Sequence, residues 1–174
     1  YPLFGVLKTK LIEQATAIRL PPHTLMSRAG DSVARLARGL CPNAETIWIA
    51  CGPGNNGGDG LEAARVLKRY GIDSVVTVAQ DSAALPDDAK RSLEGAKNEG
   101  IRFSDHPPSN LNERDLCIDA MLGIGATRAP TGLMAQWLRH MTASSAAILS
   151  VDVPSGLDPD TGLMLPETRE FTGG

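Results

Sequence analysis

Apolar runs and helical repeats alternate along most of this 174-residue chain. From Thr46 onward, short apolar runs predict strands, and the run Thr46–Cys51, which ends at a glycine, is typical of a buried parallel strand. The predicted strands are Thr46–Cys51, Ser74–Ala79, Ile101–Phe103, Leu116–Asp119 and Ala146–Val151. No apolar run approaches the roughly 18 residues that a membrane-spanning helix needs, so we expect no membrane partner.

Apolar residues with helical spacing predict the remaining elements. The predicted helices are Lys8–Ile18, Leu25–Leu40, Leu61–Tyr70, Asp87–Asn98 and Thr131–Met141. For the second helix, the predicted buried face consists of Leu25, Ala29, Val33, Leu36 and Leu40. For the last helix, it consists of Leu133, Trp137 and Met141.

The alternation of strands and helices predicts an α/β fold in a single domain over residues 1–174. Parallel strands need crossover connections, so we expect a mostly parallel sheet with helices on both faces. Ligands of such sheets bind at the carboxyl ends of the strands. Three polar, glycine-rich loops leave predicted strand ends, and they are Gly52–Gly60, Ala120–Pro130 and Asp152–Asp158.

Charge and cysteine content narrow the class of protein. The net charge is -3, which makes the chain a poor candidate for binding nucleic acid through its overall field. The cysteines, Cys41, Cys51 and Cys117, are odd in number and far apart, so we expect free thiols and a cytoplasmic protein. The three histidines lack a metal-ligand spacing, which disfavours zinc. No signal peptide is visible, although the chain begins at Tyr1 and N-terminal sequence can be missing.

The first loop belongs to the stretch CGPGNNGGDGLEAARVLKRYG, residues 51–71. Its Gly-x-Gly-x-x-Gly pattern follows a strand and opens a helix, as in loops that bind dinucleotide phosphates, although a tight turn without a ligand also fits. Asp59 stands where an anionic phosphate would lie, and with Glu62 it predicts a capping box. The lack of Gly-Lys-Ser/Thr excludes a P-loop NTPase, whereas Asp81 could hold the ribose in a dehydrogenase.

The other two loops each begin with an aspartate. Asp119 opens DAMLGIGATRAP and Asp152 opens DVPSGLD, and either aspartate could be only a turn or capping residue. Ser155 lacks a Gly-x-Ser-x-Gly elbow, which disfavours a serine hydrolase. Asn56, Asp119 and Ser155 would offer amide, carboxylate and hydroxyl oxygens, which suit a hard cation. A single carboxylate is little charge for a divalent ion, so a monovalent ion is the better candidate.

Three motifs taken together resemble a known family. GNNGGDG followed by L-x-A-A-R, then D-A-x-L-G-x-G, then DVPSGLD-x-x-T-G, are similar in sequence and spacing to the NAD(P)H-hydrate epimerase family, the YjeF N-terminal domain. The resemblance extends from Lys8 to Gly162. It implies a three-layer, Rossmann-like α/β/α fold and an isomerase that interconverts the R and S epimers of hydrated NADH and NADPH, called NADHX and NADPHX, in cofactor repair.

The resemblance also implies the site residues. The substrate-binding positions would be Asn55, Asn56, Gly57, Gly58, Asp59, Gly123, Ile124, Gly125, Ala126, Thr127, Arg128, Ala129 and Asp152. The ligands of a potassium ion would be Asn56, Asp119 and Ser155. Epimerisation by loss and re-addition of hydroxide at C6 needs an acid/base and negative charge beside a cationic ring. Asp152 is therefore the predicted acid/base, with Asp59 as a candidate assistant.

The chain departs from the family pattern in two places. Ile124 stands where the family often has a threonine, between Gly123 and Gly125. After Gly162 the chain reads LMLPETREFTGG, where the family continues with a strand and a Lys-Pro-Gly motif. Because Phe171-Thr-Gly-Gly resembles the sequence that follows that motif, we expect that a C-terminal part of the family domain is missing here.

Three functions stay open at this point. The first is the epimerase, with a dehydratase as a partner or fused domain, since some bacterial relatives fuse the two. The second is a non-catalytic nucleotide- or protein-binding scaffold, which is disfavoured because Asp59, Asp119 and Asp152 are all present. The third is an ordinary NAD(P) dehydrogenase, which Asp59 disfavours. We also expect a homodimer, in which Lys8–Leu40 could supply the interface.

Overall fold

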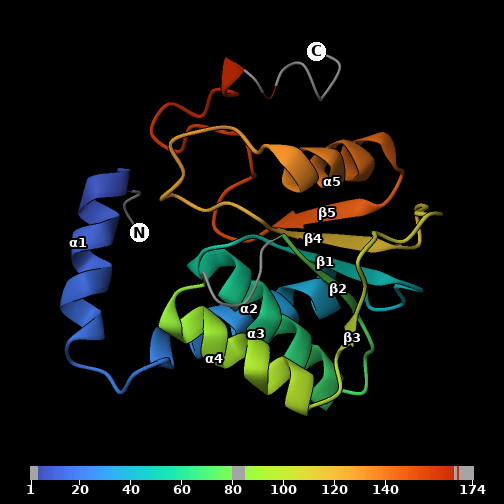
Figure 1. The fold of residues 1–174 in the computed structure, drawn as a ribbon, viewed down its shortest axis with the longest axis horizontal. Coiled ribbons are helices and arrows are strands. Elements are labelled where there is room, and N and C mark those ends of the chain that lie inside the picture. The colour runs from blue at the N-terminus through green and yellow to red at the C-terminus, as the bar shows by residue number, and fades with distance from the viewer. Residues whose placement is uncertain (1–3, 80–84, 167, 169–174) are drawn as a thin grey trace.

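The structure is a computed structural model that describes residues 4–79, 85–166 and 168 (Figure 1). Its centre is a five-stranded sheet in the order β3-β2-β1-β4-β5. The strands are β1 (Ile47–Cys51), β2 (Val75–Val78), β3 (Arg102–Phe103), β4 (Leu116–Ala120) and β5 (Ala147–Ser150). All four pairings are parallel, which confirms the predicted α/β fold. Asp81 and Phe171, which entered the predictions, lie outside the described residues.

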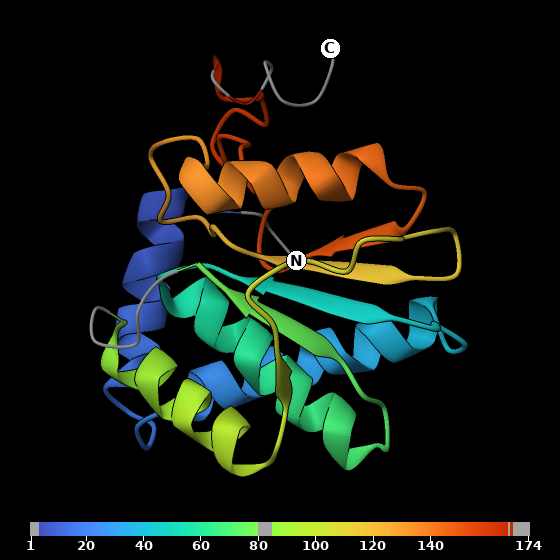
Figure 2. The ribbon, with the colours of Figure 1, turned by 45° about the vertical axis from the view of Figure 1, so that its right-hand side comes forward.

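Helices cover both faces of the sheet and make three layers, as Figures 1 and 2 show. On one face lie α2 (Thr24–Leu40), α3 (Asn55–Arg69) and α4 (Asp87–Asn98), and on the other lies α5 (Gly132–Ala143). The remaining helix, α1 (Val6–Ala17), stands apart from these layers and buries none of its residues. Within the described ranges, no helix is both long and apolar enough to cross a bilayer.

The register of the central strands brings the three predicted loops to one edge. Cys51 of β1 pairs with Ala120 of β4, and Asp119 of β4 pairs with Ser150 of β5. β1 is buried at every position, as its uninterrupted apolar sequence predicts for a central strand. The segments that follow β1, β4 and β5 therefore leave the sheet side by side.

The predicted buried face of α2 is wrong by one position. Leu36 and Leu40 are exposed, and the helix instead buries Met26, Gly30, Ala34 and Ala37. The reason is the close contact with α3, where a Cβ on Gly30 would overlap the Glu62 side chain. A stripe of small residues allows this approach, and the larger leucines are turned outward.

Two other expectations about packing need correction. Leu133 of α5 is exposed, whereas Trp137 and Met141 are buried as predicted. In the sheet that was expected to be covered on both faces, Ile148 of β5 is 42% exposed, because β5 is an edge strand of the described sheet. Cys51 and Cys117 are buried free thiols, and Cys41 is a partly buried one, as predicted.

Candidate functional site

The glycine-rich loop forms the first turns of α3, which begins at Asn55 rather than at Leu61. At several of its glycines a side chain would clash with neighbouring atoms. A Cβ on Gly57 would overlap the carbonyl oxygen of Gly52, and a Cβ on Gly60 would lie 2.6 Å from the Cβ of Ala120. The start of α3 therefore packs closely against the ends of β1 and β4, and larger residues at these positions would push it away.

The predicted capping box is wrong. Asp59 lies inside α3 instead of before it, and α3 has no side-chain cap. Glu62 makes other contacts, with its Oε1 atom 3.0 Å from Nε2 of His23 and 2.6 Å from Nη1 of Arg65. The Asp59 carboxyl is therefore not used to satisfy the helix N-terminus and can line the site.

Asp119 and Ser155 form a buried hydrogen-bonded pair between the loops that follow β4 and β5. The Ser155 hydroxyl donates to Oδ1 of Asp119 at 2.6 Å, and the Ser155 amide donates to Oδ2 at 2.8 Å. The Met121 amide also donates to Oδ1, at 3.2 Å. Burial raises the pKa of Asp119, and these hydrogen bonds oppose that rise because they favour the carboxylate.

Asp152 joins the loop after β5 to the loop after β4. Its backbone has a φ of 67°, a left-handed conformation that is uncommon outside glycine and is often found at functional sites. Its Oδ2 atom accepts a hydrogen bond of 2.7 Å from the Ile124 amide. A Cβ on Gly123 would lie 2.7 Å from this oxygen and 3.3 Å from Oδ1 of Asn56. Gly123 thus allows Asn56 and Asp152 to approach the same point.

The pair Asp119 and Ser155 and the pair Asn56 and Asp152 both contact one short segment of backbone, residues 122–123. The Leu122 amide donates to the Ser155 hydroxyl at 3.0 Å, and the next residue, Gly123, lies against Asn56 and Asp152. The three loops that the sequence predicted to meet therefore do meet. Asn56 comes from the first, Gly123 from the second, and Asp152 and Ser155 from the third, while Asp119 lies at the end of β4.

Asp59 has a strongly perturbed carboxyl group. Burial disfavours its charged form and is the largest of the causes that raise its pKa to about 7. Three nearby carboxylates also raise this pKa, and they belong to Asp152, Glu13 and Glu62. A carboxyl group that titrates near neutral pH can both give and take a proton, which is the property of a general acid/base.

The remaining predicted substrate positions differ in accessibility. Asn55, Gly125, Thr127 and Arg128 are exposed, whereas Gly57, Gly58 and Ala129 are buried. The Ala126 amide donates to the Gly123 carbonyl at 2.9 Å, which closes a turn at the start of the loop. The role of these positions in binding a substrate stays a prediction.

Helix α1 brings two residues to the site that the sequence did not indicate. Lys10 extends to within 3.8 Å of the position that a Cβ on Gly125 would occupy. Burial raises the pKa of Glu13, and the nearby carboxylate of Asp152 raises it further. Nothing in the local pattern of α1 could have placed it here, because the contact depends on the three-dimensional path of the chain.

The predicted cation ligands, Asn56, Asp119 and Ser155, offer oxygen atoms that suit a small cation. Among the described residues, no group of three or more His, Cys, Asp and Glu side chains could hold a metal ion, so a zinc-like cage is not what they offer. Asn56 is buried and its Nδ2 atom has no hydrogen-bond partner. Rotation of this amide by half a turn would place an oxygen there instead. The carboxylate of Asp119 is buried too, and its pKa is raised, so a nearby positive charge would stabilise it.

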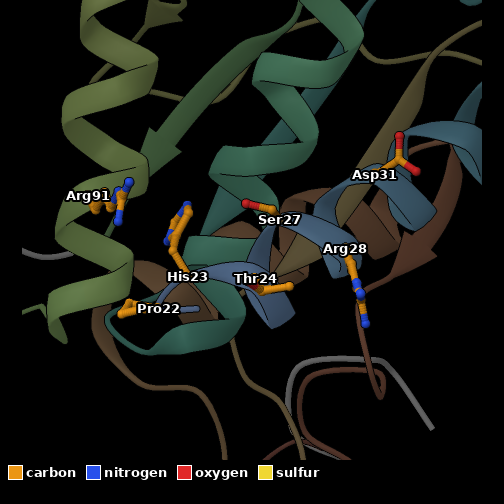
Figure 3. A pocket seen from close by; sticks show the side chains of 7 residues that line it. All are labelled: Pro22, His23, Thr24, Ser27, Arg28, Asp31 and Arg91. Carbon is orange, nitrogen blue, oxygen red and sulfur yellow. The ribbon is translucent and has the colours of Figure 1, made fainter. Parts of the chain in front are cut away.

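A separate hollow of about 450 Å³ lies at the start of α2 (Figure 3). It is lined by Pro22, His23, Thr24, Ser27, Arg28, Asp31 and Arg91. None of these residues is a predicted substrate or cation position. His23 contacts Glu62 on α3. We therefore place the functional site at the loops.

Comparison with solved structures supports the fold. A yeast protein, ynu0 (YNL200c), superposes with a TM-score of 0.83 at 24% sequence identity, over 95% of this chain and 76% of that chain. At this identity the likeness establishes the architecture alone, and it agrees with the three-layer fold described above.

Several curated proteins are similar to this chain in sequence. The bifunctional NAD(P)H-hydrate repair enzyme Nnr of Escherichia coli is 35% identical over 153 residues, which cover 86% of this chain and 29% of that protein. An NAD(P)H-hydrate epimerase of Limosilactobacillus fermentum is 34% identical over 148 residues, covering 85% of this chain and 71% of the relative. An NAD(P)H-hydrate epimerase of Bordetella pertussis is 34% identical over 155 residues, covering 87% of this chain and 67% of the relative.

The share of the relative's length that this chain spans differs between bifunctional and single-activity relatives. The chain spans about a third of the bifunctional relatives, at 29% and 32% of their lengths, and about two thirds of several single epimerases. The profile of the YjeF-related protein N-terminus matches residues 22–170, which include all three loops of the site. The chain belongs to the YjeF N-terminal domain family.

Proposed function

We propose that this domain is an NAD(P)H-hydrate epimerase, an isomerase that interconverts the R and S epimers of NADHX and NADPHX. The observation that carries the proposal is the placement of Asp59, with a pKa of about 7, near the carboxylate of Asp152 at the carboxyl edge of the sheet. Relatives that are 34% identical bear this activity in their names. Nothing in the described site favours the scaffold over the enzyme.

The chemistry needs no oxidation, only the movement of water and protons. Protonated Asp59 gives its proton to the C6 hydroxyl, which leaves as water while the lone pair of the ring nitrogen forms the C=N bond. The carboxylate of Asp152 stabilises the resulting cationic ring. Water then adds to the opposite face of C6 and loses a proton to Asp152, and solvent returns that proton to Asp59. This division keeps Asp152 as a base and gives Asp59 the acid role.

A potassium ion is part of the proposal, with Asn56, Asp119 and Ser155 as the residues that would hold it. Their amide, carboxylate and hydroxyl oxygens suit a hard monovalent ion. When bound, the ion would supply positive charge beside the buried Asp119 carboxylate and fix the loops around Gly123. The protein's own residues still carry the proton transfers.

The naming of the E. coli relative as a bifunctional repair enzyme suggests that a second activity acts beside this one. We propose that it is a dehydratase that restores the normal cofactor, in the same chain or as a partner. A homodimer also stays a prediction, as does a cytoplasmic location.

The direct test mixes the purified protein with epimerically resolved S-NADHX and follows the R form by chromatography, with and without potassium. We expect equilibration of the two epimers, and faster equilibration with potassium. Unfolding by urea, measured with potassium and with sodium, gives a second readout of the ion. No equilibration under either condition would reject the epimerase and leave the scaffold as the remaining function.

A further inference from the structure

Helix α1 lies across the carboxyl edge of the sheet although it belongs to none of the three layers. Figures 1 and 2 show it beside the loop that follows β4. Its first turn is fixed to the segment after β5, because the Val6 amide donates to Oδ1 of Asp160 at 2.9 Å. A carboxylate at a helix N-terminus is also favoured by the helix dipole. The helix is therefore held over the site by the segment that also carries Asp152 and Ser155.

One face of α1 is turned toward the site. Lys10 and Glu13 are three residues apart, so they share a helix face. The Nζ and Cε atoms of Lys10 lie 3.8 and 3.9 Å from the position of a Cβ on Gly125, in the loop of residues 123–129. Glu13 is close enough to Asp59 and Asp152 for their charges to interact. This face of α1 thus extends from the carboxylates to the loop of residues 123–129, which we call the outer loop.

The charges around the site are divided in space. Its inner part holds the carboxyl groups of Asp59, Asp119 and Asp152, which repel any phosphate. The hydrated nicotinamide ring of the proposed substrate suits this inner part, because it becomes cationic during the reaction. Its diphosphate, with two negative charges, must lie elsewhere and needs positive charge. Lys10 and the exposed Arg128 supply that charge at the outer loop.

We propose that Lys10 of α1 forms, with the loop of residues 123–129, the subsite for the diphosphate of the dinucleotide substrate. The inference rests on the proposed function for the identity of the substrate, but it concerns a subsite that can be tested without turnover. It makes α1 a binding element, and it explains why a helix with no buried residue is fixed at this edge.

Lys8 provides a matched control on the same helix. It has the same charge and is also exposed, but its Nζ atom lies 4.1 Å from the centre of the Phe4 ring instead of against the outer loop. Replacing Lys8 changes the net charge of the protein by the same amount as replacing Lys10. Any general effect of charge on binding therefore appears equally in both variants.

The test is calorimetric titration with ADP-ribose, which carries the diphosphate but lacks the nicotinamide ring. We expect Lys10→Ala to weaken binding about twofold to fivefold, within the range for an exposed charge pair. Lys10→Glu should weaken it about tenfold or more, because it adds repulsion. Lys8→Ala and Lys8→Glu should bind as the wild type does. Equal losses in the Lys8 and Lys10 variants, or no binding by the wild type at millimolar ADP-ribose, would overturn the inference.

Kinetics separates this inference from the proposed function. With NADHX, Lys10→Glu should raise KM and leave kcat close to the wild-type value. With hydrated dihydronicotinamide riboside, which lacks the diphosphate, the same variant should match the wild type. A loss of kcat on both substrates would show that Lys10 acts elsewhere. If no variant epimerises NADHX while ADP-ribose binding still depends on Lys10, the epimerase fails and the diphosphate subsite remains.

Discussion

The carboxyl edge of the sheet holds two kinds of carboxyl group. Asp119 is 1% exposed and accepts short hydrogen bonds from the amide and hydroxyl of Ser155. Asp59 and Asp152 lie nearer to solvent and share a region with Glu13, where carboxylates repel one another. The hydrogen bonds of the first environment fix the position of the Asp119 carboxylate. The second environment raises the pKa of Asp59 to about 7, so this carboxyl group can carry a proton at neutral pH. The structural role and the chemical role thus belong to different residues at this edge, and substitutions can separate them.

The largest effect should come from removing the buried acceptor. Asp119→Ala leaves the Ser155 and Met121 amides without their partner in a buried place, and we expect a loss of about 2–4 kcal/mol in the free energy of unfolding. Urea denaturation measures it. Ser150→Ala is the control, because the Ser150 hydroxyl lies 3.5 Å from Asp119 and should contribute under about 1 kcal/mol. An Asp119→Ala variant as stable as the wild type would show that the pair does not hold the loops together.

The next effect should appear in turnover and spare the fold. Asp59→Asn and Asp152→Asn remove the proton donor and the base, and each should reduce kcat by about 10²-fold or more. Asp59→Asn should unfold at a urea concentration no lower than the wild type, because burying a neutral amide costs less than burying a charge. Near-normal turnover by Asp152→Asn would remove that residue from the role, whatever Asp59 does.

A smaller effect should follow from adding a side chain at Gly123, which lies against Asn56 and Asp152. Gly123→Ala places a methyl group 2.7 Å from Oδ2 of Asp152, so this carboxylate or the loop must shift. We expect kcat/KM to fall about tenfold, in line with the cost of misplacing a group at a reacting centre. Gly54→Ala is the control, since nothing lies within 4 Å of a Cβ there. Equal kinetics in the two variants would mean that the approach of Asn56 and Asp152 is not needed.

The elements were predictable because their signals are local. Apolar runs such as that of β1 and helical repeats such as that of α4 depend only on nearby residues, and strand alternation then fixed the parallel sheet. The meeting of the three loops followed from the same reasoning, since parallel strands end at one edge. Asp119 and Ser155 could therefore be paired in advance as members of one set.

The errors arose where packing between distant segments decides. The glycines before Asp59 read as a loop, yet close contact with β1 and β4 makes them the first turns of α3. The larger leucines of α2 read as its buried face, yet the contact with α3 selects small residues. Lys10 was missed for a similar reason, because only the fold brings α1 to the outer loop.

The smallest effect concerns the proton on Asp59. Since its pKa is about 7 and the protonated form is the acid, kcat/KM should fall as pH rises above 7. Stability should follow the same sign. The folded pKa lies above the ordinary value of 3.8, so the neutral group favours folding below about pH 4, and that advantage is lost as pH rises toward 7.

Glu13→Gln sharpens this test, because it removes one of the charges that raise the pKa of Asp59. The alkaline fall of kcat/KM should move to lower pH by about a few tenths of a unit, since Glu13 is exposed and its charge is screened by salt. Gln14→Glu, which adds a carboxylate at the next exposed position of α1, is the control for charge on the helix. A pH profile unchanged by Glu13→Gln, or shifted to higher pH, would show that α1 does not act on Asp59, and the raised pKa would then come from burial and the other carboxylates alone.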